Sequence, residues 1–284
     1  MKKIFYSILI FLLILLNFST VCADDVDNEG EFENTVEVTA SSVTALPKTN
    51  SRRYIVYDRI SKSMIIGKNE DVKSAMASTT KIMTTIVILE KADLNEKVTV
   101  SAKAGGTGGS RLGLKRGDKA SVRDLLYGLM LRSGNDAAVA LAEHVGGSVK
   151  GFAELMNEKA IELGLTNTHF VTPHGLDDAN HYTTALELAK LTDYAMDNET
   201  FAKIVGTKST TIYINNQSRQ INNTNELLGV LNGVVGVKTG FTNNAGRCLV
   251  TETKRNNMDI ITIVLGADTK KDRTKDSVNL IEYT

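Results

Sequence analysis

Hydrophobic and polar positions alternate at both ends of the folded part of the chain. Residues 53–58 and 63–67 alternate around a polar turn at 59–62, a pattern that predicts an opening β-hairpin. After about residue 208 the same period of two returns in further segments, at 209–214, 218–222, 234–239, 247–251 and 259–265. The last three of these follow one another closely enough to form strands linked by hairpins.

The stretch between these segments has the period of an α-helix. The first helix begins at Ser78 and is apolar nearly all round, which predicts that it is buried. The later helices are marked by their ends: a capping box at Ser121–Asp124, a candidate N-cap at Asp136 with a stop at Gly146–Gly147, a helix from Val149 to Leu163 followed by Gly164, and a capping box at Thr184 and Glu187. A closing helix is predicted over 272–283.

Strand patterns on both sides of a helical block favour an α+β domain, in which the opening hairpin completes a sheet formed by the last strands. Neither internal repeats nor low-complexity stretches interrupt the pattern after residue 51. We therefore expect one folded domain over residues 51–284.

Residues 1–23 have the layout of a secretory signal peptide. Lys2 and Lys3 precede an apolar run over 4–16, and Val21-Cys22-Ala23 supplies the small residue that a signal peptidase requires. The run is shorter than the ~20 apolar residues of a membrane-spanning helix, which makes an uncleaved anchor the less favoured alternative. Cleavage near Ala23 would give a secreted, extracytoplasmic protein associated with the cell envelope.

Residues 24–50 are acidic and then rich in serine and threonine, with no basic residue before Lys48. Such a segment buries little surface and repels itself, so it is predicted to be a flexible linker. Removal of Cys22 with the signal peptide would leave Cys248 as the single thiol, which excludes an intramolecular disulfide. Cys248 lies on a predicted strand and is interpreted as a small core residue.

Basic and acidic residues number 33 each, so the chain lacks the basic excess of a nucleic-acid-binding protein. We therefore expect no nucleic-acid partner. His169, His174 and His181 lie close together in sequence, but no carboxylate stands at the spacing of a known zinc helix. They are interpreted as loop packing, and neither a metal nor another cofactor is predicted.

The first candidate chemical motif is Ser78-Thr-Thr-Lys81, at the start of the buried helix. Residues three apart share a helix face, so the Lys81 amine can approach the Ser78 hydroxyl. Taken alone, the motif could be an N-cap serine followed by a surface lysine. Its context favours chemistry, because Lys81 lies inside an almost wholly apolar helix, where an unpaired ammonium is costly.

Two further motifs follow at the ends of predicted elements. Ser133-Gly-Asn135 lies in the break between two helices, where a hydroxyl and an amide can relay a proton and hold a peptide group. Lys238-Thr239-Gly240, followed by Phe241-Thr242, closes a predicted strand. Its lysine and threonine can bind a carboxylate, while glycine allows a substrate backbone to approach. Either motif alone would be an ordinary turn.

Together, S-x-x-K, S-x-N and K-T-G in this order are the signature of penicillin-recognising active-site serine enzymes. The chain also resembles the low-molecular-mass D-alanyl-D-alanine carboxypeptidases over residues 52–284, in the stretches 109–114, 133–142, 173–177, 225–228 and 236–242. This resemblance implies the serine D-Ala-D-Ala peptidase and β-lactamase type of fold. That fold is a five-stranded antiparallel sheet with helices on both faces and a helical subdomain, and the motifs would converge on one cleft.

The resemblance also implies a role for each motif residue. Ser78 would be the nucleophile and Lys81 its base, while Ser133 would shuttle the proton and Asn135 would orient the peptide. Lys238, Thr239 and Thr242 would bind the terminal carboxylate beside Gly240. The backbone N–H groups of Ser78 and Phe241 would form the oxyanion hole.

The implied substrates are peptidoglycan stem peptides ending in D-Ala-D-Ala, and the implied inhibitors are β-lactam antibiotics. Because the chain resembles the shorter, single-domain members, no C-terminal membrane anchor is expected. A class A-like β-lactamase would add an E-x-x-L-N loop, which is absent between Asn135 and Lys238. A catalytically silent peptidoglycan-binding or β-lactam-sensing module is a second alternative. The balance of carboxypeptidase, endopeptidase and transpeptidase activity stays open.

Overall fold

The structure is a computed structural model that describes residues 46–284. The predicted signal peptide, and the predicted linker up to residue 45, lie outside the described residues. The strands are β1 (Arg53–Asp58), β2 (Ser63–Lys68), β3 (Lys97–Thr99), β4 (Lys119–Ser121), β5 (Ser209–Ile214), β6 (Gln217–Asn222), β7 (Val234–Thr242), β8 (Gly246–Arg255) and β9 (Met258–Ala267). The helices are the 3₁₀ helix η1 (Ala77–Thr80), α2 (Lys81–Lys91), α3 (Ala102–Gly105), α4 (Val122–Leu131), α5 (Asn135–Gly146), α6 (Val149–Glu162), α7 (Ala185–Met196), α8 (Glu199–Val205) and α9 (Lys270–Glu282).

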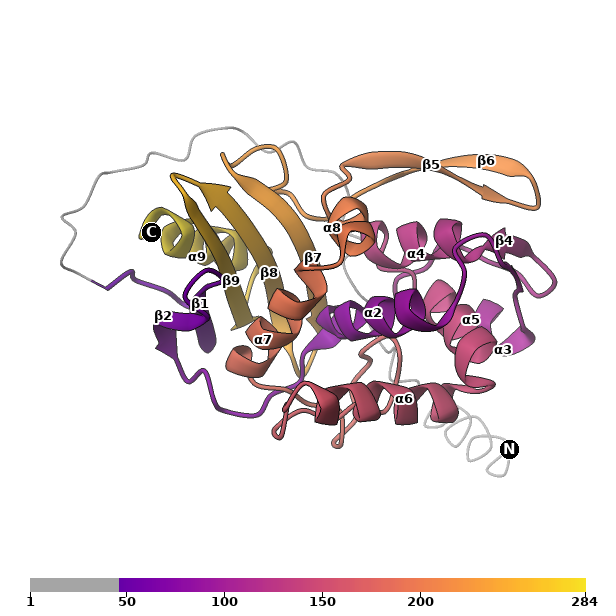
Figure 1. Ribbon diagram of the computed structural model, residues 1–284, viewed down its shortest axis with the longest axis horizontal. Coiled ribbons are helices and arrows are strands. Elements are labelled where there is room, and N and C mark those ends of the chain that lie inside the picture. The colour runs from indigo at the N-terminus through magenta and orange to yellow at the C-terminus, as the bar shows by residue number, and fades with distance from the viewer. Residues whose placement is uncertain (1–45) are drawn as a thin grey trace, which may run out of the picture.

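The main sheet has five strands in the order β2-β1-β9-β8-β7, all antiparallel. The opening hairpin joins it through β1, which pairs with β9 so that Arg53 lies opposite Leu265. The predicted hairpin links from β7 to β8 and from β8 to β9 are confirmed. The sequence therefore predicted that strands from both ends of the folded domain meet in one sheet (Figure 1).

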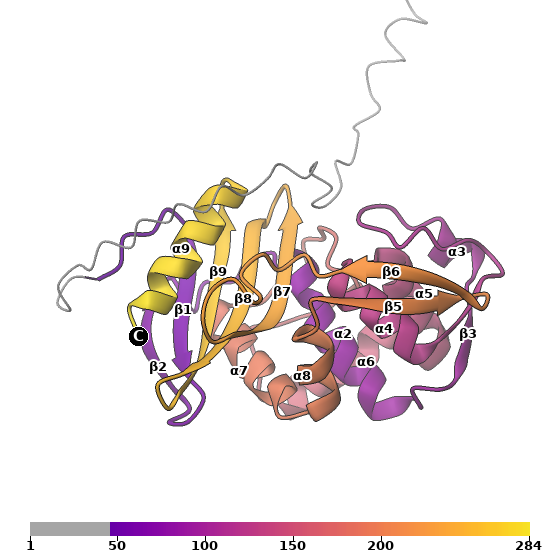
Figure 2. The same cartoon turned by 90° about the horizontal axis from the view of Figure 1, so that it is seen from above.

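Each face of the main sheet is covered by helices, because apolar side chains alternate between the faces. Tyr54 and Val56 pack with Leu280 of α9 on one face. Ile55 and Ile263 belong to the large core on the other face, where α7, α8 and η1 contact the strands. In Figure 2 α9 lies along one side of the sheet and α7 and α8 lie on the other.

The helical part surrounds α2, whose residues 81–88 are all buried as predicted. This helix contacts α4, α5, α6, α7 and α8. A second sheet of four strands, in the order β3-β4-β5-β6, lies beside these helices. The sequence predicted the strands β5 and β6 but not β3 and β4, because each of those two has only three residues, too few to show alternation.

Two of the three helix caps predicted from the sequence are confirmed, whereas the short helices α3 and α8 were not predicted. Ser121 and Thr184 accept the predicted capping hydrogen bonds from backbone N–H groups three residues later. Asp136, however, is not an N-cap: Gly134 occupies that position, and Asp136 lies in the first turn of α5. Its carboxylate instead accepts the backbone N–H groups of residues 112–114, which fixes the preceding loop against α5.

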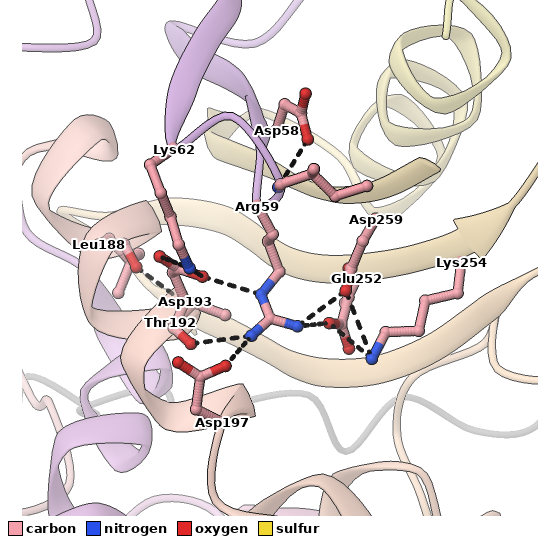
Figure 3. Close-up of polar contacts among 11 residues, drawn as sticks. Asp58, Arg59, Lys62, Leu188, Thr192, Asp193, Asp197, Glu252, Lys254 and Asp259 are labelled. Atoms are coloured by element: carbon pink, nitrogen blue, oxygen red, sulfur yellow. Dashed lines mark hydrogen bonds and ion pairs between the residues drawn. The ribbon is translucent and has the colours of Figure 1, made fainter. Parts of the chain in front are cut away.

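A buried ion-pair network joins the turn after β1 to the rest of the sheet (Figure 3). The Arg59 guanidinium donates to Asp193 at 2.9 Å, to Asp197 and Glu252 at 2.6 Å and to Asp259 at 2.9 Å. Burial alone would lower the pKa of Arg59, but these carboxylates raise it above its usual value. Burial, with the neighbouring Asp259 carboxyl adding to the effect, raises the pKa of Glu252 to about 7. The network thus links the β1–β2 turn to α7, β8 and β9.

Candidate active site

The centre of the site lies where η1 passes into α2. Ser78 belongs to η1, and Lys81 is the first residue of α2. The Lys81 amine donates to the Ser78 hydroxyl oxygen at 2.7 Å, and the Lys81 side chain is fully buried. The spacing of three residues in the sequence therefore places this amine and hydroxyl in direct contact.

The second motif completes the surroundings of Lys81. Its amine also donates to the side-chain oxygen of Asn135 at 2.7 Å and to the backbone carbonyl of His174 at 2.9 Å. Asn135 is the first residue of α5, and its amide nitrogen donates to the Gly108 carbonyl at 2.9 Å. This last contact defines the orientation of the amide, with its oxygen toward Lys81.

Ser133 lies in the tight connection between α4 and α5. Its φ of 57° is in the left-handed region, which is uncommon for a residue with a side chain. The hydroxyl is buried and has no hydrogen-bond partner within residues 46–284. Strained backbone and an unsatisfied buried hydroxyl cluster at functional sites, where a bound substrate can supply the missing partner.

The third motif lies on the edge strand β7. The Lys238 side chain is buried, and its amine donates to the Thr239 carbonyl at 2.9 Å. The Thr239 hydroxyl shares a 2.8 Å hydrogen bond with that of Thr224. Thr242 donates to Asp177 at 2.6 Å. These contacts hold the end of the strand in one conformation.

Gly240 brings this strand against Ser78. A Cβ atom at position 240 would lie 3.0 Å from the backbone nitrogen of Ser78 and 3.2 Å from the Cβ atom of Ala77. Only a residue without a side chain allows β7 to pass so close to η1. The Phe241 ring packs under the Arg247 guanidinium, with 3.8 Å between guanidinium carbon and ring centre. The first two motifs are therefore in contact through Lys81 and Asn135, and the third approaches Ser78 at Gly240.

Three residues that shape the site were not assigned a chemical role from the sequence. His174 contributes a backbone carbonyl, and such a contact leaves no trace in the residue type. Thr224 and Asp177 bind motif threonines from loops that are distant in sequence. Asp177 lies in a stretch that carries the family resemblance, which is the available signal; nothing in the local pattern marks Thr224.

His169, His174 and His181 lie in a loop region and have different hydrogen-bond partners. Burial lowers the pKa of His174 to about 3 and that of His181 to about 4, so both are neutral. The Nδ1 atom of His181 accepts the Val171 N–H at 3.0 Å, and its Nε2 atom bonds the Thr80 hydroxyl at 2.8 Å. His169 binds the Asn180 carbonyl. Within residues 46–284 no group of three or more potential ligands is arranged to hold a metal ion.

Cys248 is fully buried in the core, as predicted. It lies opposite Gly240 in the pairing of β8 with β7, so it supports the strand that contacts Ser78. Burial raises the pKa of its thiol to about 11, and the thiol is therefore protonated at neutral pH.

The fold is that of the DD-peptidases, as two solved structures show. The crystal structure of the Streptomyces K15 DD-transpeptidase superposes with a TM-score of 0.79 and 34% sequence identity, covering 84% of this chain and 98% of that one. A structure of the D-alanyl-D-alanine carboxypeptidase DacD from Francisella tularensis gives a TM-score of 0.77 at 29% identity, covering 89% of this chain and 75% of that one.

Residues 38–269 match the family model described as D-alanyl-D-alanine carboxypeptidase. The D-alanyl-D-alanine carboxypeptidase DacF of Bacillus subtilis is 37% identical over 235 residues, which cover 81% of this chain and 60% of the relative. DacC of Escherichia coli, which carries the same activity in its name, is 38% identical over 268 residues, 86% of this chain and 63% of the relative. The chain belongs to the D-alanyl-D-alanine carboxypeptidase family. It spans about three fifths of the length of these curated relatives.

Proposed function

We propose that the protein is a serine-type D-alanyl-D-alanine carboxypeptidase that removes the terminal D-Ala from peptidoglycan stem peptides. The observation that carries this proposal is the 2.7 Å contact from the Lys81 amine to the Ser78 hydroxyl, in a buried site that also contains Asn135. Membership of the family and the activity printed for its curated relatives support the same reaction.

In the first half of the reaction Ser78 is acylated. For this step Lys81 is neutral: its amine keeps the hydrogen bonds to Asn135 and the His174 carbonyl. Its lone pair takes the hydroxyl proton while the Ser78 oxygen attacks the carbonyl carbon between the two D-alanines. The backbone N–H groups of Ser78 and Phe241 hold the oxyanion, and one such donor is worth roughly 10² to 10³ in rate. The close passage of Gly240 over Ser78 supports this pairing, because it brings the backbone of β7 to the nucleophile.

Ser133 then carries the proton from Lys81 to the nitrogen of the departing D-Ala. The C–N bond breaks, and the rest of the peptide remains as an ester on Ser78. The unpartnered, buried hydroxyl of Ser133 supports this relay, because substrate would supply its missing hydrogen bond. In the second half water attacks the ester and gives its proton to Lys81. Lys81 passes this proton to the Ser78 oxygen as the C–O bond breaks, and the shortened peptide leaves as a carboxylic acid.

The rest of the motif residues bind the peptide. Lys238, Thr239 and Thr242 hold the terminal carboxylate at the end of β7, and the Asn135 amide orients the acyl part. The hydroxyls of Thr239 and Thr242 already have partners in Thr224 and Asp177, so carboxylate binding has to share or replace those hydrogen bonds.

Inhibition by β-lactams follows from the same chemistry. Penicillin mimics acyl-D-Ala-D-Ala, and attack by Ser78 opens its ring to a tethered ester that obstructs water. Because the E-x-x-L-N glutamate of class A β-lactamases is absent from the sequence, the adduct should persist for minutes or longer. The predicted signal peptide and a substrate in the cell wall support a location outside the cytoplasm. No helix of residues 46–284 has the length and hydrophobicity to cross a membrane.

The test compares the parent protein with Ser78→Ala and Lys81→Arg. D-Ala release from a pentapeptide is measured together with covalent labelling by a fluorescent penicillin, and the labelled peptide is identified by mass spectrometry. Both variants should lose both activities. Ser78→Ala removes the hydroxyl that attacks, and Lys81→Arg replaces the base by a guanidinium that stays protonated. Ser148→Ala is the matched control, since Ser148 also stands at a helix start but belongs to α6, away from the site.

The alternatives predict different results. Rapid multiple turnover of penicillin without a detectable adduct would support the β-lactamase alternative. Labelling without any D-Ala release, under all conditions tested, would support a catalytically silent module. Labelling retained in Ser78→Ala would refute the assignment of the nucleophile.

A further inference from the structure

A pocket lined by arginines lies beside the motif residues. Arg111, Arg132 and Arg219 line it, together with the polar side chains of Gln220 and Asn222, and it encloses about 320 Å³. That volume can hold a polar side chain of a bound peptide. No acidic side chain of residues 46–284 lines the pocket, so its charged lining is entirely positive. We refer to it as the arginine pocket.

The arginine pocket is linked to the second and third motifs through neighbouring residues and hydrogen bonds. Arg132 directly precedes Ser133, the proposed proton donor to the leaving nitrogen. Asn222 ends β6 two residues before Thr224, whose hydroxyl bonds Thr239 at 2.8 Å. The Thr224 N–H also donates to the carbonyl of residue 131 at the end of α4, which joins the two sides of the pocket. Figure 2 shows the β5–β6 hairpin lying along the helical part and leading toward β7.

Two of the three guanidinium groups are held by hydrogen bonds that leave most of their donors available, whereas Arg132 is exposed. Arg219 donates to the Leu112 carbonyl, and Arg111 donates to the Gly105 carbonyl at 2.9 Å. A guanidinium has five N–H donors, so a single carbonyl leaves several for a ligand. Their planar fork matches a carboxylate in a bidentate contact. Leu112 itself is fixed through Asp136, which keeps this side of the pocket in place.

We propose that the arginine pocket binds a carboxylate of the leaving group, in addition to the α-carboxylate held at the end of β7. The inference rests on the proposed function and deepens it. It predicts that, among leaving D-amino acids with a long side chain, one whose side chain carries a carboxylate is released faster than its uncharged analogue. The bond broken is the same D-Ala peptide bond, and the leaving nitrogen takes the same proton.

The experiment uses two peptides that share an acyl part and differ only in the leaving residue, acyl-D-Ala-D-Glu and acyl-D-Ala-D-Gln. Acyl-D-Ala-D-Ala is measured beside them with each protein. For the parent, kcat/KM should favour the D-Glu peptide over the D-Gln peptide by about tenfold, the size of one charge-assisted contact. Arg132→Gln should reduce this ratio to about twofold or less, whereas Arg132→Lys should retain an intermediate ratio.

Arg123→Gln is the matched control, because Arg123 is an exposed arginine on the same helix, α4, outside the pocket. It should leave the ratio unchanged, which separates local binding from the overall charge. Equal rates for the D-Glu and D-Gln peptides in the parent, with normal D-Ala release, would overturn the arginine pocket alone. Release of D-Ala without release of D-Glu or D-Gln would also overturn the arginine pocket alone. Failure to release any of the three amino acids would overturn the proposed function as well.

Discussion

Replacing Gly240 by alanine tests how the third motif is brought to the first. The added Cβ atom would lie 3.0 Å from the Ser78 nitrogen, 3.2 Å from the Ala77 Cβ atom and 3.3 Å from the Thr79 nitrogen. Favourable contacts between carbon atoms lie at about 3.5–4.0 Å, so β7 and η1 would have to separate by several tenths of an ångström. All the close atoms belong to the backbone or to a Cβ, and none can move away by a rotamer change.

The expected effect is larger on acylation than on folding. Overpacking of this size costs roughly 1–3 kcal/mol of unfolding free energy. An oxyanion donor must lie within about 2.7–3.1 Å of its target, and loss of one donor costs roughly 10² to 10³ in rate. We therefore expect the second-order rate constant for acylation by a fluorescent penicillin to fall by about tenfold to a hundredfold, with urea unfolding measured on the same samples.

Gly206→Ala provides the control. A Cβ atom there would lie 3.1 Å from the carbonyl of Val235, so it crowds the opposite end of β7 without touching η1. It should cost comparable stability while leaving acylation near the parental rate. If Gly240→Ala is folded and acylates as fast as the parent, the close approach of the strand does not position the reacting groups, and our reasoning about the site is wrong.

Three further predictions concern charge and burial. Arg59→Met should lower the unfolding free energy in urea by about 3–5 kcal/mol, since it removes the buried partner of Glu252 and leaves only the half-exposed Lys254 beside that carboxyl. Arg52→Met breaks an exposed ion pair and should cost under about 1 kcal/mol; equal effects would contradict this. His174 and His181 have folded-state pKa values below the ordinary 6.5, so the unfolded chain binds more protons and stability should fall as pH is lowered from about 6.5 to 4, by up to ~1.4 kcal/mol per pH unit for each. The raised pKa of Glu252 acts in the opposite sense between about 4.5 and 7, so the slope should weaken in His181→Gln and steepen in Glu252→Gln. Cys248 should resist a maleimide in the native protein and react once urea is added, as read from the mass of its peptide; rapid native labelling would show that the strand pair opens.

The sequence predicted those parts of the fold that rest on periodicity. The main sheet, the buried helix α2 and the capped ends of α4 and α7 follow from alternation, from apolar residues on every side, and from side chains that bind N–H groups nearby. The small strands β3 and β4 did not follow, because three residues carry no period. Asp136 was misassigned because its partners belong to a loop that precedes it by more than twenty residues.

The site was predictable to the extent that side-chain chemistry carries it. Ser78, Lys81 and Asn135 were found from their motifs and are in contact in the structure. The carbonyl of His174 escaped detection because any residue type could supply it. The Arg59 network was not predicted for another reason. Its carboxylates come from α7, β8 and β9, and only the folded chain brings them together.

The position of β1 inside the main sheet has a consequence for the order of folding. β1 lies between β2 and β9, so the second edge of the first strand is paired only when the last strand joins the sheet. Contacts between distant parts of a chain form slowly, because a long loop has to close first. The helices around α2, from α4 to α8, lie nearer to it in the sequence than β9 lies to β1, so their contacts close shorter loops. Acylation requires β7 to lie against η1, and β7 is held in the sheet through β8 and β9. Covalent labelling by a fluorescent penicillin during refolding should therefore lag behind the recovery of helical circular dichroism. The time at which labelling begins then reports when the sheet closes.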